Sequence, residues 1–159
     1  PHLAEVEKNH LVMVMRTQIG GPFAAHSYDD GASWSKPQMV GLAGGESMPV
    51  IATLPRSGDL LLIWNNSVYD PAHDHFGKRT PLSTAISNDA GSTWIKGPDI
   101  ESDPVWEYSN PSINILSGNR IIVTYFASKM ANPNPPGALG RDRMSLHGFV
   151  ATEEWFYST

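Results

Sequence analysis

The sequence predicts an all-β fold built from four-stranded antiparallel units, and three observations support this prediction. An eight-residue motif of the form S-x-D-x-G-x-x-W occurs at 27–34 and again at 87–94, so the two copies start 60 residues apart. The longest apolar runs, such as 60–64, have the length of a strand. No stretch of about a dozen residues carries a convincing helical period. We therefore expect a repeated β unit of about 60 residues.

The motif has the composition of a tight turn between two strands. Its aspartate can accept hydrogen bonds from turn amides, and its glycine can adopt a backbone conformation that residues with a Cβ avoid. Its tryptophan then covers the turn with apolar area. Two copies in register indicate a structural repeat, and they support the fold without indicating a chemical activity.

The segments between the motifs read as strands that are bounded by turn-forming residues. The apolar or β-branched stretches lie at 11–16, 48–54, 60–64, 82–87, 111–116 and 120–126. Each period then contains strand, short turn, strand, longer loop, strand, motif turn and strand, which describes one blade of a β-propeller. A chain of 159 residues holds about two and a half such blades. We expect residues 1–159 to form a single portion of a propeller, with two complete blades and a partial one.

The composition is that of an ordinary soluble protein and narrows the classes of function. The net charge is −5, and no basic run is interleaved with aromatic residues, so nucleic acid is not an expected partner. Cysteine is absent, which excludes disulfides and thiolate chemistry but fits either the cytoplasm or a disulfide-free secreted protein. The chain shows no targeting segment and no apolar run long enough for a membrane helix, so we expect no membrane partner and leave the compartment open.

Blade connectivity predicts which loops share one edge of the molecule. Loops from the second to the third strand of a blade, and from one blade to the next, open on one edge, while the motif turns occupy the other. Polar and aromatic side chains on the first edge would form a sugar-binding cleft. That edge would carry Arg16, Thr17, Gln18, Glu46, the loop 65–79 with His75 and Arg79, Glu107, Tyr108 and the loop 128–143.

Each candidate residue has a functional and a structural interpretation. Arg16 directly follows an apolar strand, and Arg79 precedes one, so each either binds anions and hydroxyls or is a solvated charge at a strand end. Tyr108 beside Glu107 forms either a nucleophile with an activating carboxylate or an ordinary buried tyrosine. His73, Asp74 and His75 offer metal ligands, acid–base groups or a solvated loop; we expect no metal and no cofactor.

At these residues the chain resembles the Asp-box, or BNR-repeat, families, and specifically the C-terminal half of the sialidase-like six-bladed propellers. The resemblance covers essentially the whole chain and implies that the two motifs, the Asp boxes, lie on the edge opposite the active site. It implies that Arg16 is one arginine of a carboxylate-binding triad and that Tyr108 is the nucleophile. It places a catalytic glutamate just before Pro1, and a third arginine where this sequence has Val105, Trp106 and Glu107.

The resemblance implies a glycoside hydrolase related to exo-sialidases that acts on an anionic or hydroxyl-rich sugar. Tyr108 and Glu107 would be the catalytic residues, and the substrate would contact Arg16, Gln18, Glu46, Arg79 and His75. The rival interpretation is a non-catalytic carbohydrate-binding or scaffold propeller. We expect the chain alone to be inactive, and we expect either self-association or a missing N-terminal half to cover its open flank.

Overall fold

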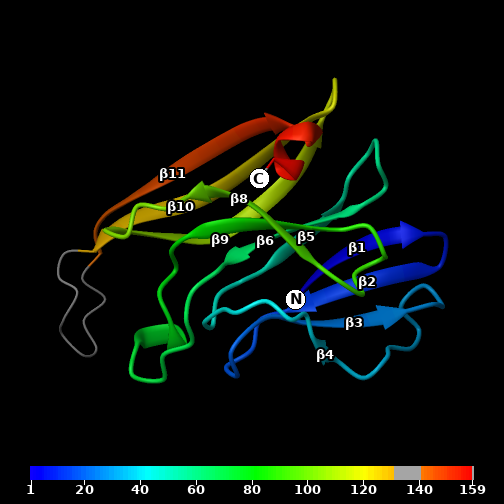
Figure 1. The fold of residues 1–159 in the computed structure, drawn as a ribbon, viewed down its shortest axis with the longest axis horizontal. Coiled ribbons are helices and arrows are strands. Elements are labelled where there is room, and N and C mark those ends of the chain that lie inside the picture. The colour runs from blue at the N-terminus through cyan, green and yellow to red at the C-terminus, as the bar shows by residue number, and fades with distance from the viewer. Residues whose placement is uncertain (131–140, 159) are drawn as a thin grey trace.

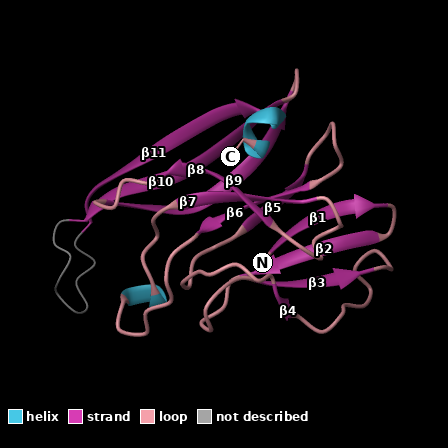
Figure 2. Cartoon of the chain, viewed as in Figure 1, coloured by secondary structure: helices cyan, strands magenta, loops and turns pink. Residues whose placement is uncertain are grey.

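The computed structural model describes residues 1–130 and 141–158, which form eleven strands and two short 3-10 helices (Figure 2). The strands form three antiparallel sheets. The first sheet contains β1 (His2–Glu7), β2 (His10–Met15), β3 (Phe23–Ser27) and β4 (Gln38–Met39). The second contains β5 (Val50–Thr53), β6 (Leu60–Asn65), β7 (Leu82–Ser87) and β8 (Ile95–Glu101). The third contains β9 (Trp106–Leu116), β10 (Arg120–Met130) and β11 (Arg141–Thr152).

Each sheet pairs its strands in sequence order, as in a propeller blade, and the three sheets follow one another along the chain (Figure 1). The two Asp boxes join β3 to β4 and β7 to β8, which are the third and fourth strands of their blades. The prediction of two four-stranded blades and a partial third is therefore confirmed. The three sheets formed by the described residues do not close into a ring. No helix in the described part of the chain is long and apolar enough to cross a membrane.

The third sheet differs in length from its predicted strands. The sequence predicts strands at 111–116 and 120–126, whereas β9 and β10 each span 11 residues. β9 continues toward its N-terminal end past Pro111, and its pairing with β10 shifts register between Thr124 and Phe126. Proline lacks the N–H needed for regular strand pairing, so the sequence pattern predicts that this strand starts at Pro111. In the structure the strand continues through Pro111 and is only irregular there. The extension brings Tyr108 into a strand rather than a loop.

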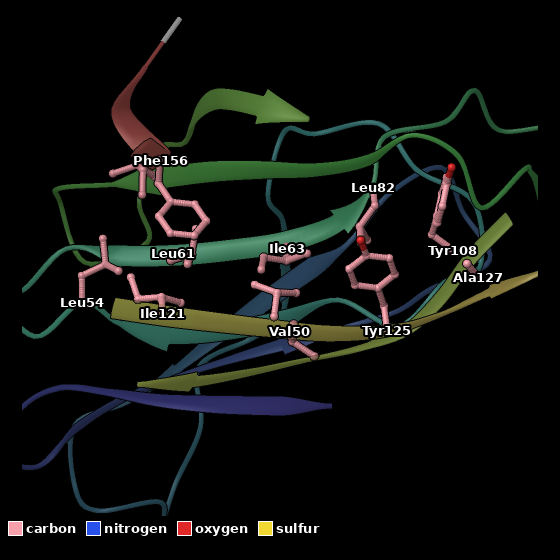
Figure 3. Packing of buried hydrophobic residues seen from close by; sticks show 12 residues of the cluster. Val50, Leu54, Leu61, Ile63, Leu82, Tyr108, Ile121, Tyr125, Ala127 and Phe156 are labelled. Carbon is pink, nitrogen blue, oxygen red and sulfur yellow. The ribbon is translucent and has the colours of Figure 1, made fainter. Parts of the chain in front are cut away.

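The core lies between neighbouring blades. All six residues of β6 are buried, because the middle sheet packs against a blade on each of its faces. One cluster joins the second and third blades through residues such as Leu61, Ile63 and Val123, and Figure 3 shows its side chains. The other joins the first and second blades through Val12, Leu62 and others. Each fully buried aliphatic side chain contributes about 1.5–3 kcal/mol to folding relative to exposure.

The Asp boxes have the same hydrogen bonds in both copies. The Thr93 N–H and hydroxyl donate to the Asp89 carboxylate at 2.8 and 2.6 Å, and Ser33 makes the same two bonds to Asp29. Gly91 has φ +88°, a left-handed conformation that glycine adopts without steric cost. Both tryptophans donate to the carbonyl of the motif glycine at 3.1 Å. Both are half-buried, so their truncation should cost less than the loss of a fully buried indole.

The C-terminal 3-10 helix η2 (Glu153–Tyr157) contacts both the second and the third blade and connects them. Phe156 is fully buried in the cluster between these blades. Glu153 is also buried, and its carboxylate accepts hydrogen bonds from the backbone N–H groups of Arg56 and Ser57, in the turn between β5 and β6, at 3.1 and 2.9 Å. A buried charge is tolerated there because it satisfies two turn amides.

Candidate functional site

The loops predicted to share one edge do so. In Figure 1 the loop that carries the 3-10 helix η1 (Asp74–Phe76), the end of β10 and the start of β11 all lie on the left side of the molecule. The hairpin turns between β5 and β6 and between β9 and β10 lie on the right side. The left side is called the loop edge below, and the opposite side is the Asp-box edge. Residues 131–140 of the predicted loop 128–143 lie outside the described residues.

Glu46 is one of the predicted site residues, and three others, Arg16, Gln18 and His75, surround its carboxylate. The Arg16 Nε lies 3.7 Å from Glu46 Oε1, and Gln18 Nε2 donates to Oε2 at 3.1 Å. His75 Nδ1 lies 3.9 Å from Oε2, and the His75 carbonyl accepts from the Glu46 N–H at 2.6 Å. Glu46 is largely covered, whereas the Arg16 side chain is 51% exposed. The guanidinium is therefore oriented by Glu46 and still accessible to a ligand.

Two glycines allow this cluster to form. Gly45 and Gly77 approach so closely that a Cβ on Gly45 would lie 2.9 Å from the Gly77 Cα. Gly77 has φ +153°, at the limit of the region that residues with a Cβ rarely enter. The loop before β5 and the loop after β6 can therefore pack backbone to backbone, which brings His75 to Glu46.

A second group joins the same loop to the third blade. The Asn65 amide nitrogen, at the end of β6, donates to the carbonyls of Arg79 and Tyr108 at 2.8 and 3.1 Å. The Tyr108 N–H also donates to the Arg79 carbonyl at 2.9 Å. Asn65 and Arg79 are both buried. Arg79 and Tyr108 are thus held side by side by a buried amide, and the loop 65–81 connects them to the Glu46 cluster.

Tyr108 packs near Tyr125 at the end of the core cluster that lies away from Phe156 (Figure 3). The two rings meet edge to face with centroids 6.0 Å apart. Burial, and then the nearby charge of Glu101, raises the pKa of Tyr108 to about 12. The Tyr125 hydroxyl donates to Glu101 Oε1 at 2.6 Å, and burial followed by this bond raises the pKa of Tyr125 as well. The Glu101 carboxylate therefore interacts with the phenol groups of both Tyr108 and Tyr125.

The expected partnership of Tyr108 with Glu107 stays a prediction, and the alternation of side chains along β9 argues against it. Trp106 and Tyr108 both pack in the cluster between the second and third blades. Side chains alternate along a strand, so Glu107 points to the other face of β9. Glu107 stays at the loop edge, but the carboxylate close to the Tyr108 ring comes from the end of β8.

Sequence reasoning missed Glu101, Tyr125 and His147. His147 Nδ1 lies 3.7 Å from Glu101 Oε1, and its Nε2 forms a hydrogen bond of 2.9 Å with the Ser145 hydroxyl. These residues come from β8, β10 and β11, and their spacing in the sequence follows no motif. Only the pairing of Tyr125 with His147 across β10 and β11, together with blade packing, brings them together. An explicit register for the third sheet was the one signal that could have found them.

The remaining candidate residues do not form a metal site. Among the described residues, no group of three or more His, Asp and Glu side chains is arranged to hold a metal ion. The ring of His73 bonds the carbonyl of Asp74 at 2.7 Å, while His75 turns toward Glu46. The two histidines therefore face different partners.

Comparison with known proteins identifies the family. Residues 1–123 match the family model described as BNR repeat-like domain, which is more than half of the chain. The chain belongs to this BNR repeat-like family. No curated protein sequence matches it.

Solved structures share the fold of this BNR repeat-like chain at low sequence identity. The NanB sialidase of Streptococcus pneumoniae, in its K499G form, has 18% identity and a TM-score of 0.61 over 78% of this chain and 19% of its own. The Ruminococcus gnavus intramolecular trans-sialidase has 16% identity and a TM-score of 0.67 over 99% of this chain and 33% of its own. A Penicillium chrysogenum α-L-arabinanase has 16% identity and a TM-score of 0.66 over 95% of this chain and 45% of its own.

These likenesses support a sialidase-like, glycoside hydrolase-related fold. The chain spans less than half the length of each of these structures. Because these structures are named as a sialidase, a trans-sialidase and an arabinanase, the shared fold does not select one sugar.

Proposed function

We propose that the loop edge forms part of the sugar site of a glycoside hydrolase-related propeller that acts on an anionic or hydroxyl-rich sugar. The observation that carries this proposal is the position of Glu101. Its carboxylate accepts a hydrogen bond from Tyr125 and adds to the effect of burial in raising the pKa of Tyr108, at the edge where Arg79 is held against the Tyr108 backbone. Perturbed titrating groups gathered at one edge are typical of functional sites.

Arg16 and Arg79 are the proposed contacts for an anionic or hydroxyl group of the sugar. A guanidinium binds a carboxylate through two parallel N–H donors, which fixes the orientation of the ligand as well as its position. Glu46 orients Arg16 at 3.7 Å, and Gln18 and His75 surround the same carboxylate. These three residues would add hydrogen-bonding groups for sugar hydroxyls.

In the catalytic form of the proposal, Tyr108 is the nucleophile and Glu101 is its proton acceptor. The Tyr108 Oη would form a bond to the anomeric carbon while the bond from that carbon to the leaving-group oxygen breaks. The phenol proton would pass to the Glu101 carboxylate. Water would then attack the anomeric carbon as the bond from that carbon to the Tyr108 Oη breaks. The Tyr108 oxygen would recover its proton from Glu101, the proton released by water would pass to the departed leaving-group oxygen, and the sugar would leave with retained configuration.

The second candidate is a non-catalytic carbohydrate-binding propeller, and the burial of Tyr108 favours it. The Tyr108 side chain is 3% exposed and has a pKa of about 12, so the phenolate is strongly disfavoured at neutral pH. Sugar binding through Arg16 and its neighbours requires no such ionisation. A trapping experiment separates the two candidates.

Calorimetric titration with sialic acid tests the binding part of the proposal. We expect Arg16→Ala to weaken binding by about tenfold, since a charge-assisted hydrogen bond is lost. The matched control is Arg120→Ala, because Arg120 is the first residue of β10, on the Asp-box edge, where its Nε donates to the Ser117 carbonyl. Equal affinity in the Arg16 variant and the wild type would exclude Arg16 from the site.

Mass spectrometry tests the catalytic part. After incubation with a sialoside that carries a good leaving group, the catalytic form predicts a glycosyl adduct on Tyr108 that is missing in Tyr108→Phe. Sugar binding without any adduct would support the non-catalytic candidate.

A further inference from the structure

A cavity of about 350 Å³ lies between the first and second blades at the Asp-box edge, away from the proposed site. Its wall includes His26, Tyr28, Lys36 and Gln38 from the first blade and Gly91 and Ser92 from the second Asp box. The volume falls at the lower end of the range of small-molecule sites. All of its lining comes from the two complete blades of this chain, so the cavity does not depend on any further blade.

Tyr28 forms an exposed but well-supported aromatic surface in this cavity. Its side chain is 69% exposed. Its ring stacks on that of His10, with centroids 4.4 Å apart and planes 29° apart. His10 is buried, and its Nε2 forms a hydrogen bond of 3.1 Å with His26 Nδ1. The tyrosine is therefore held from one side by a fixed imidazole pair, while much of it faces solvent.

The Asp-box turn itself does not require an aromatic side chain at this position. The equivalent residue of the second Asp box is Asn88, and that turn makes the same aspartate hydrogen bonds as the first. Leaving a large aromatic ring in water forgoes apolar burial. The Asp-box turn therefore does not account for the exposed aromatic ring of Tyr28, and a ligand can contact this ring.

The polar groups around Tyr28 suit hydroxyls better than charges. Gln38 is exposed and offers both a donor and an acceptor, and the His26 imidazole lines the same wall. Burial, followed by the nearby His10, lowers the pKa of His26, so its ring is neutral at neutral pH. Lys36 is exposed, and the lining holds no arginine and no carboxylate. The cavity therefore lacks the guanidinium donors of the loop edge.

We propose that this cavity is a second sugar-binding site, which takes a neutral sugar unit by stacking the sugar ring on Tyr28 and hydrogen-bonding its hydroxyls to Gln38 and His26. The C–H face of a pyranose is apolar and packs on an aromatic ring, while its equatorial hydroxyls point sideways to planar amide and imidazole groups. This site is independent of the proposed function at the loop edge.

The test is binding of methyl β-glucoside and methyl β-galactoside to the whole chain, measured by saturation-transfer NMR and calorimetry. The main variant is Tyr28→Asn, which introduces the residue that the second Asp box already carries, so the turn is expected to fold. We expect it to weaken binding of the preferred sugar by at least about tenfold. Tyr28→Phe should keep most of the affinity, because stacking needs only the ring.

Two controls make the result specific. Tyr69→Ala removes an exposed tyrosine that stacks on Phe76 in the loop between β6 and β7, and it should leave binding unchanged. Arg120→Ala should also leave it unchanged, since Arg120 belongs to the third blade and does not line the cavity. Added salt should have little effect, because no ion pair is involved. The proposal is overturned if neither sugar binds, if Tyr28→Asn binds as wild type, or if Tyr69→Ala abolishes binding.

Discussion

At the scale of single residues, the Asp-box aspartates stabilise the fold because their charged carboxylates accept hydrogen bonds within the turn. Asp89 accepts two hydrogen bonds from Thr93 and one from the Ser87 hydroxyl, at 2.6–2.8 Å. These bonds, led by that of the Thr93 hydroxyl, lower the pKa of Asp89 to about 2. The carboxylate is therefore favoured in the folded state relative to the unfolded chain, where its pKa is near 4.

This shift predicts an acid-dependent loss of stability. Because the folded-state pKa lies below the unfolded value, the contribution of Asp89 is present above about pH 4 and is lost as the pH falls toward 2. Asp89→Asn should lower the free energy of unfolding by about 1 kcal/mol at neutral pH and flatten this acid dependence. Urea unfolding at several pH values measures both effects. Asp30→Asn, in the variable position of the first box, should behave as wild type.

Tyr108 predicts the opposite dependence at alkaline pH. Its folded-state pKa of about 12 lies above the ordinary value near 10, so its stabilising contribution is present below pH 10 and is lost as the pH rises toward 12. In Glu101→Gln, the tyrosine should titrate at lower pH because a nearby negative charge is gone. The difference between the ultraviolet titrations of each protein and its Tyr108→Phe variant isolates this group. An unchanged Tyr108 titration in Glu101→Gln would remove Glu101 from the proposed site.

At the scale of elements, η2 joins two blades through one buried carboxylate. Glu153→Ala would remove the buried carboxylate that accepts hydrogen bonds from the backbone N–H groups of the exposed residues Arg56 and Ser57. We expect a loss of about 2–3 kcal/mol in the free energy of unfolding. Glu154→Ala is the matched control, since Glu154 is exposed and its surface ion pair with Arg56 should contribute little to stability. Equal losses in the two variants would contradict the account of η2.

The elements could be predicted from the sequence to the extent that they repeat. The two Asp boxes and the strands between them follow from turn chemistry and from a period that both complete blades share. The third sheet was predicted less well, because Pro111 and the register shift near Thr124 interrupt its pattern. Its strand β9 carries Tyr108, so the error also affected the site.

The site was predictable where loop order alone determines proximity. Arg16, Gln18, Glu46 and His75 meet because blade connectivity places their loops at one edge. Glu101 was not predictable in this way, since it reaches the Tyr108 and Tyr125 rings only through packing between two blades. Sequence adjacency suggested Glu107 instead, although strand alternation separates neighbouring side chains.

At the scale of the whole molecule, the two outer sheets present apolar side chains to solvent. On β11, Met144, Leu146 and Val150 are 59%, 69% and 51% exposed, and they share one face because they alternate along the strand. Leu3 on β1 is 50% exposed at the other end of the array. The described sheets therefore leave apolar flanks that a further blade or a second molecule would cover.

These flanks predict that the isolated chain self-associates. Sedimentation velocity should show larger species as the concentration rises, and Leu146→Lys should shift the distribution toward monomer by placing a charge in the apolar face. The control is Val68→Lys, which places the same charge at an exposed residue in the loop after β6. A strictly monomeric chain over a wide concentration range would contradict this prediction.

We propose that the loop edge binds an anionic or hydroxyl-rich sugar and that the hydrogen bonds of the Asp-box aspartates support the fold. The most direct test is an NMR titration of the isotopically labelled chain with sialic acid, which follows backbone amides at both edges. We expect the backbone amide signals of Gln18, Glu46, His75 and Arg79 to shift progressively, and those of Asp89 and Thr93 to stay unchanged. Shifts confined to the Asp-box edge, or no shifts at the loop edge at saturating sugar, would contradict this proposal.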